Sequence, residues 1–159
     1  MLTNAQRNTL LAAVKADATA GPIRTIGDVT GLVSYLNGAA TPTALAWLPA
    51  APVMAVEEAP NYTTYDSLAQ GKRDSWMVFL RSARDFGKAK VRNWVVDIWG
   101  AATASSNAES VLKAATESAT VAQVAIGGAS KTTGTVTAMD RAFDEQVSTA
   151  DGEWLCQQA

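Results

Sequence analysis

Histidine is absent from this chain of 159 residues. A Ser-His-Asp or Cys-His nucleophile, the usual imidazole general base and nearly all zinc sites depend on that side chain. The absence excludes these mechanisms. The sequence therefore predicts no catalytic residue, no metal site and no cofactor, and we expect a protein that is not an enzyme.

Cysteine and long apolar runs are also scarce. Cys156 is the single cysteine, so no internal disulfide can form. No stretch approaches the roughly 20 apolar residues that a membrane-spanning helix needs, and we expect no membrane partner. The N-terminal segment lacks the order of regions found in a secretory signal, which predicts a protein that is cytoplasmic at synthesis.

Two short motifs resemble catalytic or nucleotide-binding signatures without completing them. Ser110 and Lys113 have the S-x-x-K spacing of serine enzymes that use lysine as a base, but the later elements of that signature are shifted or missing. The segment AIGGASKT, residues 125–132, is similar to a phosphate-binding loop, but Ser130 stands where the glycine before the lysine belongs. Neither motif predicts a site.

The spacing of apolar residues predicts a mainly α protein. Helical spacing occurs in a first segment that Thr3 caps and that ends before residue 20, and then in 26–38, 65–84 and 88–100, while Asn107 is expected to cap a fifth helix over 108–118. Residues 39–63 hold four of the five prolines, which favours an irregular crossing segment. After residue 118 the pattern alternates with a period of two and predicts a β-hairpin.

The expected fold is therefore a helical bundle of about four to five helices with a small C-terminal β-hairpin and an extended tail. Residues 1–118 are expected to form the helical core. Residues 119–159 are expected to supply the hairpin, a short helix and the tail, an arm that reaches a neighbour and is not an independent domain.

Tryptophans mark the expected core. Trp76 and Trp94 fall on the apolar faces of two predicted helices, Trp99 lies one step off such a face, and Trp47 stands in the proline-rich crossing. Large aromatic side chains at helical spacing are typical of a packed interior. We expect these four residues to anchor the core.

Basic residues concentrate in one stretch. Seven of the thirteen lysines and arginines lie there: Lys72, Arg73, Arg81, Arg84, Lys88, Lys90 and Arg92. Only Asp74 and Asp85 oppose them, so this stretch has a formal charge of +5 while the whole chain has −2. Three interpretations stay open: a solvated helix face, a contact with a neighbouring subunit, or a DNA-binding surface.

The order of these features resembles a family of small structural proteins of tailed bacteriophages. The resemblance rests on LTNAQRNTLLAAVKAD, the linker Trp47 and WMVFLRSARDFGKAKVRNWVVDIWG, followed by an Ala/Thr/Ser-rich loop, a helix and a Gly/Thr-rich hairpin. It implies a non-enzymatic virion protein, a neck or adaptor subunit that forms a homo-oligomeric ring in the head-tail connector. Trp76, Trp94 and Trp99 match the family's aromatic positions, and Arg84, Lys88, Lys90 and Arg92 match its basic segment.

The resemblance also implies partners and a location. The partners would be further copies of the chain, the portal protein and tail or neck proteins, with non-specific contact to packaged DNA left open. The location would be the head-tail interface of the virion, and the host cytoplasm during assembly. Two alternatives stand beside the connector: a capsid decoration protein, and a small phage DNA-binding protein that uses the basic helix.

Overall fold

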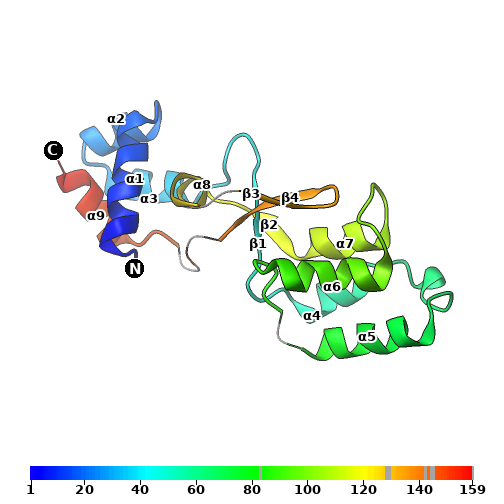
Figure 1. Cartoon of the computed structure of the whole chain (residues 1–159). Coiled ribbons are helices and arrows are strands. Elements are labelled where there is room, and N and C mark those ends of the chain that lie inside the picture. The colour runs from blue at the N-terminus through cyan, green and yellow to red at the C-terminus, as the bar shows by residue number, and fades with distance from the viewer. Residues whose placement is uncertain (83, 128–129, 142, 144–145, 159) are drawn as a thin grey trace. The chain divides into compact units, whose positions relative to one another are not determined.

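The computed structural model describes residues 1–82, 84–127, 130–141, 143 and 146–158. In it the chain divides into two compact units (Figure 1). Unit 1 consists of Met1–Ala44, Ser118–Gly128 and Arg141–Ala159, and unit 2 consists of Leu45–Glu117 and Ala129–Asp140. Each unit is assembled from segments that are distant in sequence, so neither folds from one continuous stretch.

Unit 1 is helical throughout its described elements. These are α1 (Asn4–Ala16), α2 (Ala20–Thr25), α3 (Val29–Asn37), α8 (Val121–Ile126) and α9 (Thr149–Gln157). Leu10 of α1, Leu32 of α3 and Leu155 of α9 are buried in one apolar cluster. Burying a leucine side chain stabilises a fold by roughly 1.5–3 kcal/mol, so these contacts hold the separate segments together.

Three helices of unit 1 begin with the same local device. The hydroxyl side chain of the capping residue accepts a hydrogen bond from the backbone amide three residues later. The side chain at that later position in turn accepts a hydrogen bond from the backbone amide of the capping residue. The pairs are Thr3 with Gln6, Thr120 with Gln123, and Ser148 with Asp151. Each pair satisfies amides that the first turn of a helix leaves unbonded, which sets where α1, α8 and α9 begin.

Unit 2 contains a mixed sheet with the strand order β2-β1-β4-β3. The strands are β1 (Leu45–Trp47), β2 (Thr116–Ser118), β3 (Ser130–Thr133) and β4 (Val136–Asp140). β1 and β4 are parallel, with Ala46 opposite Met139, and β3 and β4 form an antiparallel hairpin. The parallel pair brings the proline-rich crossing against the C-terminal third of the chain.

The helices of unit 2 are α4 (Val53–Glu58), α5 (Gln70–Arg81), α6 (Ala89–Trp99) and α7 (Asn107–Ala114), with a 3-10 turn, η1, at Tyr62–Thr64. α6 lies between α5 and α7 (Figure 1). Trp76 stacks on Phe79 with ring centroids 5.4 Å apart and meets the edge of Trp99 at 5.2 Å. Trp47 and Trp76 are fully buried, and Trp94 and Trp99 pack partly buried against the same cluster.

The expected fold class is wrong. Instead of a bundle of four to five helices, the described residues form nine α-helices and a four-stranded mixed sheet, an α/β arrangement. The sequence did not predict β1, because the strand is only three residues long and lies among prolines. A segment of this kind shows no alternation of polar and apolar residues. Its partner β4 is distant in sequence, so the pairing leaves no local pattern.

Two further parts of that expectation fail at the C-terminal end. The β-branched stretch that begins at Thr120 forms helix α8, because its capping pair with Gln123 outweighs a weak strand propensity. The expected extended tail is helix α9, in which Asp151 and Leu155 are fully buried. A hairpin does form, from β3 and β4, but it belongs to the sheet.

The two units divide the chain differently from the expected boundary at residue 118. Residues 119–159 supply α8 and α9 to unit 1 and the β3–β4 hairpin to unit 2. Residues 1–118 likewise contribute to both units. The C-terminal segment is thus part of both cores in this structure.

Candidate functional site

The seven clustered cations fall on α5, α6 and the segment between them, all in unit 2. Four of these side chains are exposed: Lys72, Arg81, Lys88 and Lys90. Arg73 is half-buried, and Arg84 and Arg92 are buried. The basic stretch therefore contains exposed cations and buried cations, and the sequence alone did not distinguish them.

Arg84 stabilises the end of α5. Its Nε donates to the carbonyl oxygen of Phe79 at 2.5 Å, and its Nη2 donates to that of Leu80. The guanidinium also lies 5.2 Å from the centroid of the Phe79 ring. Burial lowers the pKa of this guanidinium. Since the last carbonyls of a helix lack partners within it, Arg84 serves as a cap.

Arg92 connects α6 to two other parts of unit 2. Its Nη1 donates to the carbonyl oxygens of Phe86 at 2.6 Å and Gly87 at 2.8 Å, and its Nε donates to Thr133 Oγ1 at 3.0 Å. The guanidinium lies 4.9 Å from the centroid of the Trp47 ring. Burial lowers its pKa, while the charges of Asp140 and Asp85 oppose that shift. The guanidinium groups of Arg84 and Arg92 thus make hydrogen bonds within unit 2 and stabilise its fold.

The exposed cations remain available to a partner. Lys88 forms an ion pair with Asp85 at 3.6 Å. Lys72, Arg81 and Lys90 make no side-chain hydrogen bond or ion pair with any residue that the structure describes. The exposed cations of α5 and of the start of α6 are therefore candidate contact residues, and three of them, Lys72, Arg81 and Lys90, have no charged partner among the described residues.

The charge of unit 2 as a whole limits what this surface can attract. Its two segments contain nine basic and nine acidic residues, so its formal charge is zero. Acidic residues precede the basic stretch: residues 45–71 hold Glu57, Glu58 and Asp66 and no lysine or arginine. Charges of opposite sign are thus separated within one neutral unit, a pattern that favours protein contacts over the long-range attraction of a polyanion.

A shallow groove of about 610 Å³ runs between α4 and α5. Its apolar lining consists of Met54, Tyr62, Tyr65, Met77 and Leu80. Sequence reasoning missed this groove. Met77 lies off the face of α5 that holds Trp76 and Phe79, and an apolar residue off the buried stripe of an amphipathic helix is the signal that indicates a second contact face.

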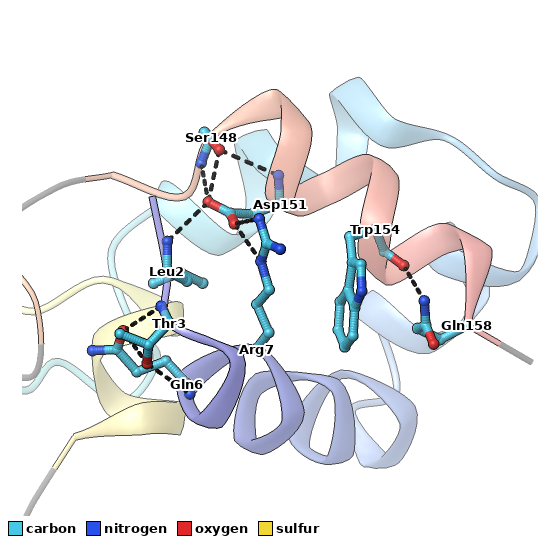
Figure 2. Close-up of polar contacts among 8 residues, drawn as sticks. All are labelled: Leu2, Thr3, Gln6, Arg7, Ser148, Asp151, Trp154 and Gln158. Carbon is cyan, nitrogen blue, oxygen red and sulfur yellow. Dashed lines mark hydrogen bonds and ion pairs between the residues drawn. The ribbon is translucent and has the colours of Figure 1, made fainter.

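Unit 1 contains a polar cluster around the fully buried Asp151 (Figure 2). Arg7 of α1 reaches the first turn of α9, where its Nη2 lies 2.7 Å from Asp151 Oδ1. Asp151 also accepts hydrogen bonds from Ser148 Oγ at 2.7 Å and from the amide of Leu2 at 3.4 Å. Arg7 lies over the ring of Trp154, 5.8 Å from its centroid. This cluster joins two helices, and its carboxylate is fully occupied by donors from the protein.

A second carboxylate in unit 1 borders a small apolar cavity of about 40 Å³. Asp17 accepts hydrogen bonds from the amides of Ala20 and Thr19, at 2.7 and 2.8 Å, and from the hydroxyl of Tyr35. The Ala20 amide contributes most to lowering the pKa of Asp17, and burial opposes it. A carboxylate with a lowered pKa and three donors is a poor base, so the arrangement fits a cap for α2.

The two incomplete motifs are also explained by local structure. On α7, Ser110 Oγ donates to the carbonyl oxygen of Ser106 at 3.2 Å, and Lys113 pairs with Glu109 at 3.1 Å. Lys131 of the loop-like motif lies on β3 and pairs with Asp140. Residues 128 and 129 of that motif lie outside the described residues. Ser110, Lys113 and Lys131 therefore each have a structural partner.

Searches of the described residues add two negative findings. They contain no group of three or more Cys, Asp or Glu side chains placed to hold a metal ion. Within the same residues, no helix combines the length and apolar character needed to cross a membrane. No family model, curated protein or solved structure matches this chain.

Proposed function

We propose that this protein is a non-enzymatic structural subunit of a bacteriophage virion, most specifically a head-tail connector subunit that forms a ring between portal and tail. The proposal begins from the resemblance carried by the N-terminal segment and the tryptophan-rich basic helices. Its partners are further copies of the chain, the portal and tail or neck proteins, at the head-tail interface.

The observation that carries this proposal is the separation of free charges on a neutral unit. Lys72, Arg81 and Lys90 are exposed and unpaired among the described residues, whereas unit 2 has no net charge. Binding to duplex DNA gains affinity from the release of many counterions and is typical of a surface with excess positive charge. A balanced unit with free charges of both signs suits contact with other protein subunits better.

The contacts are proposed to come from folded surfaces. The C-terminal residues that were expected to form an arm lie in α9, where Leu155 is buried in unit 1. The exposed lysines at the start of α6, Lys88 and Lys90, are the more direct candidates for a neighbour. Non-specific contact between some of these lysines and packaged DNA is compatible with that role.

Charge reversal at Lys88 and Lys90 tests the role. The variant Lys88→Glu/Lys90→Glu should retain its helical circular dichroism but reduce the joining of filled heads to tails, scored by electron microscopy, about tenfold or more. Lys88→Arg/Lys90→Arg keeps the charge and serves as the matched control. Normal yields of joined particles with the reversed variant would rule out this surface.

DNA binding by the purified protein distinguishes the alternative. We expect weak binding to a duplex, with a small change between 50 and 200 mM salt. Tight binding that falls by about 10³-fold over that range would indicate several phosphate contacts and would favour the DNA-binding protein instead.

A further inference from the structure

Unit 2 exposes several large apolar side chains on α4, on α5 and in the 3-10 turn between them. The large exposed apolar side chains there all lie between residues 53 and 78: Val53, Met54, Tyr62, Met77 and Val78. Met54 is 68% exposed and Met77 is 43% exposed, and both line the groove between α4 and α5. Contiguous apolar patches on soluble proteins commonly mark interaction sites.

One flank of this groove is acidic. Glu57 and Glu58 line it from α4, and both side chains are exposed. Neither makes a hydrogen bond or ion pair with a described residue. These two adjacent carboxylates without partners lie beside the exposed Met54, so this flank could pair with a basic group next to an apolar surface.

The other flank is basic. Arg73, Met77 and Arg81 are spaced by four residues on α5, which places them along one face of the helix. Arg73 donates to Gln70 Oε1 at 2.8 Å, while Arg81 is exposed and has no partner among the described residues. Met77 lines the groove, and Arg73 and Arg81 lie one helical turn before and after it on α5, outside the groove lining. We call the groove together with these flanking groups the α4–α5 face.

We propose that the α4–α5 face binds the same face of a second copy of this chain across a two-fold axis. A two-fold contact presents one surface to itself, so α4 of each copy meets α5 of the other. The carboxylates of Glu57 and Glu58 then face Arg81 of the partner, and the methionines become buried at the centre. This apolar centre with a charged rim is the usual arrangement of a protein interface.

Charge complementarity selects a second copy over other occupants. A basic peptide would meet Arg73 and Arg81, and an acidic one would meet Glu57 and Glu58, so each is repelled by one flank. The copy alone matches both flanks at once. The pairing does not depend on the proposed virion role, because two copies can join through this face with or without a ring.

The size of the face predicts modest affinity. α5 has 12 residues and is about 18 Å long, so two such helices provide a contact at the lower end of specific interfaces. We expect a dissociation constant in the micromolar range, on the order of 10 μM. The purified full chain should therefore change from monomer to dimer between about 1 and 200 μM in sedimentation velocity.

Substitution at the centre of the face tests the location. Met77→Glu should weaken dimerisation at least tenfold, because it buries an unpaired charge, while the exposed position lets the monomer fold normally. Ile26→Glu is the matched control, since Ile26 is an exposed apolar residue of unit 1. It should leave the dissociation constant unchanged within about twofold.

Charge exchange tests the two-fold pairing. Glu58→Arg and Arg81→Glu should each weaken dimerisation about threefold to tenfold, because each places like charges opposite one another. The double variant should recover affinity to within about threefold of the original chain. A mixture of the two single variants should form a mixed dimer more readily than either forms its own.

Several results would overturn this pairing. They are a monomer throughout the concentration range, dimerisation that Met77→Glu leaves intact, equal disruption by Ile26→Glu, or a double charge variant as weak as its parents. Larger oligomers that survive the loss of this face would assign self-association to another surface. These outcomes concern the isolated protein, so they are independent of whether it is present in virus particles.

Discussion

The guanidinium of Arg7 and the carboxylate of Asp151 lie 2.7 Å apart, although the two residues are 144 positions apart in sequence. The Asp151 side chain is fully buried, whereas that of Arg7 is 16% exposed. This pair, together with the hydrogen bond that the Leu2 amide donates to Asp151, fastens α9 to the N-terminal segment and α1 in unit 1, while Ser148 caps α9 itself. Removal of the C-terminal helix α9 should consequently lower the free energy of unfolding of the protein.

Removing the Asp151 carboxylate should destabilise unit 1. We expect Asp151→Ala to lower the free energy of unfolding by about 2–4 kcal/mol, because it removes a helix cap and leaves Arg7 without its partner. Glu153→Ala, an exposed change on the same helix, should stay within about 0.5 kcal/mol. Urea unfolding followed by circular dichroism measures both, and equal losses would contradict a special role for Asp151.

Acid should weaken the same unit. Burial raises the pKa of Asp151, but hydrogen bonds from Ser148, Arg7 and the Leu2 amide outweigh it, so the pKa lies below its ordinary value. The resulting stability is present above the unfolded value of about 3.9 and is lost as pH falls through the lower folded value.

Hydrogen exchange measured by mass spectrometry can localise that acid effect. Protection of α1 and α9 should fall as pH decreases below about 4, after correction for the intrinsic exchange rate. In Asp151→Asn the protection should be lower near neutral pH and depend less on pH. An unchanged pH profile in this variant would assign the acid sensitivity to other groups.

The buried and exposed cations should behave differently. Arg92→Lys loses the fork that reaches the Phe86 and Gly87 carbonyls and should cost roughly 2–4 kcal/mol in stability. Lys90→Gln, an exposed change two positions earlier, should stay within about 0.5 kcal/mol. Urea unfolding measures the free energy of unfolding of the two variants. An Arg92→Lys protein as stable as the original chain would show that Arg92 is not needed for the fold.

Gly134 should resist substitution. It turns the β3–β4 hairpin at φ 61°, and an added Cβ would lie 2.1 Å from the carbonyl oxygen of Ala102. Gly134→Ala should therefore lower the melting temperature, with a stability loss of at least about 1 kcal/mol. Gly71→Ala meets no atom within 4 Å in α5 and should instead raise stability by up to about 1 kcal/mol. Opposite or equal shifts would contradict this geometry.

Some elements could be predicted from sequence because their signals are local. The stripe of Leu10 and Val14 after a Thr3 cap marks α1, and the repeat of Val91, Val95 and Ile98 marks α6. These patterns repeat every three or four residues and need no knowledge of the rest of the chain. The Trp76 and Phe79 stripe located α5 for the same reason.

Other elements depended on distant partners and could not be predicted in this way. β1 is defined by its pairing with β4, and α9 by packing against α1 and α3. The same limit applies to the candidate site. Arg92 is buried against Phe86, Gly87 and Thr133, whereas Lys90, two positions earlier, is exposed. Composition identified the basic stretch, but only the structure separates its buried members from its exposed ones.

Counting copies of the protein in purified bacteriophage particles tests its proposed place in the virion most directly. Quantitative mass spectrometry against isotope-labelled peptides would give its ratio to the portal protein and to the major capsid protein. We expect a ratio close to that of the portal, as a connector ring requires. A ratio near that of the capsid protein would indicate decoration of the shell, and absence from the particle would contradict the structural role.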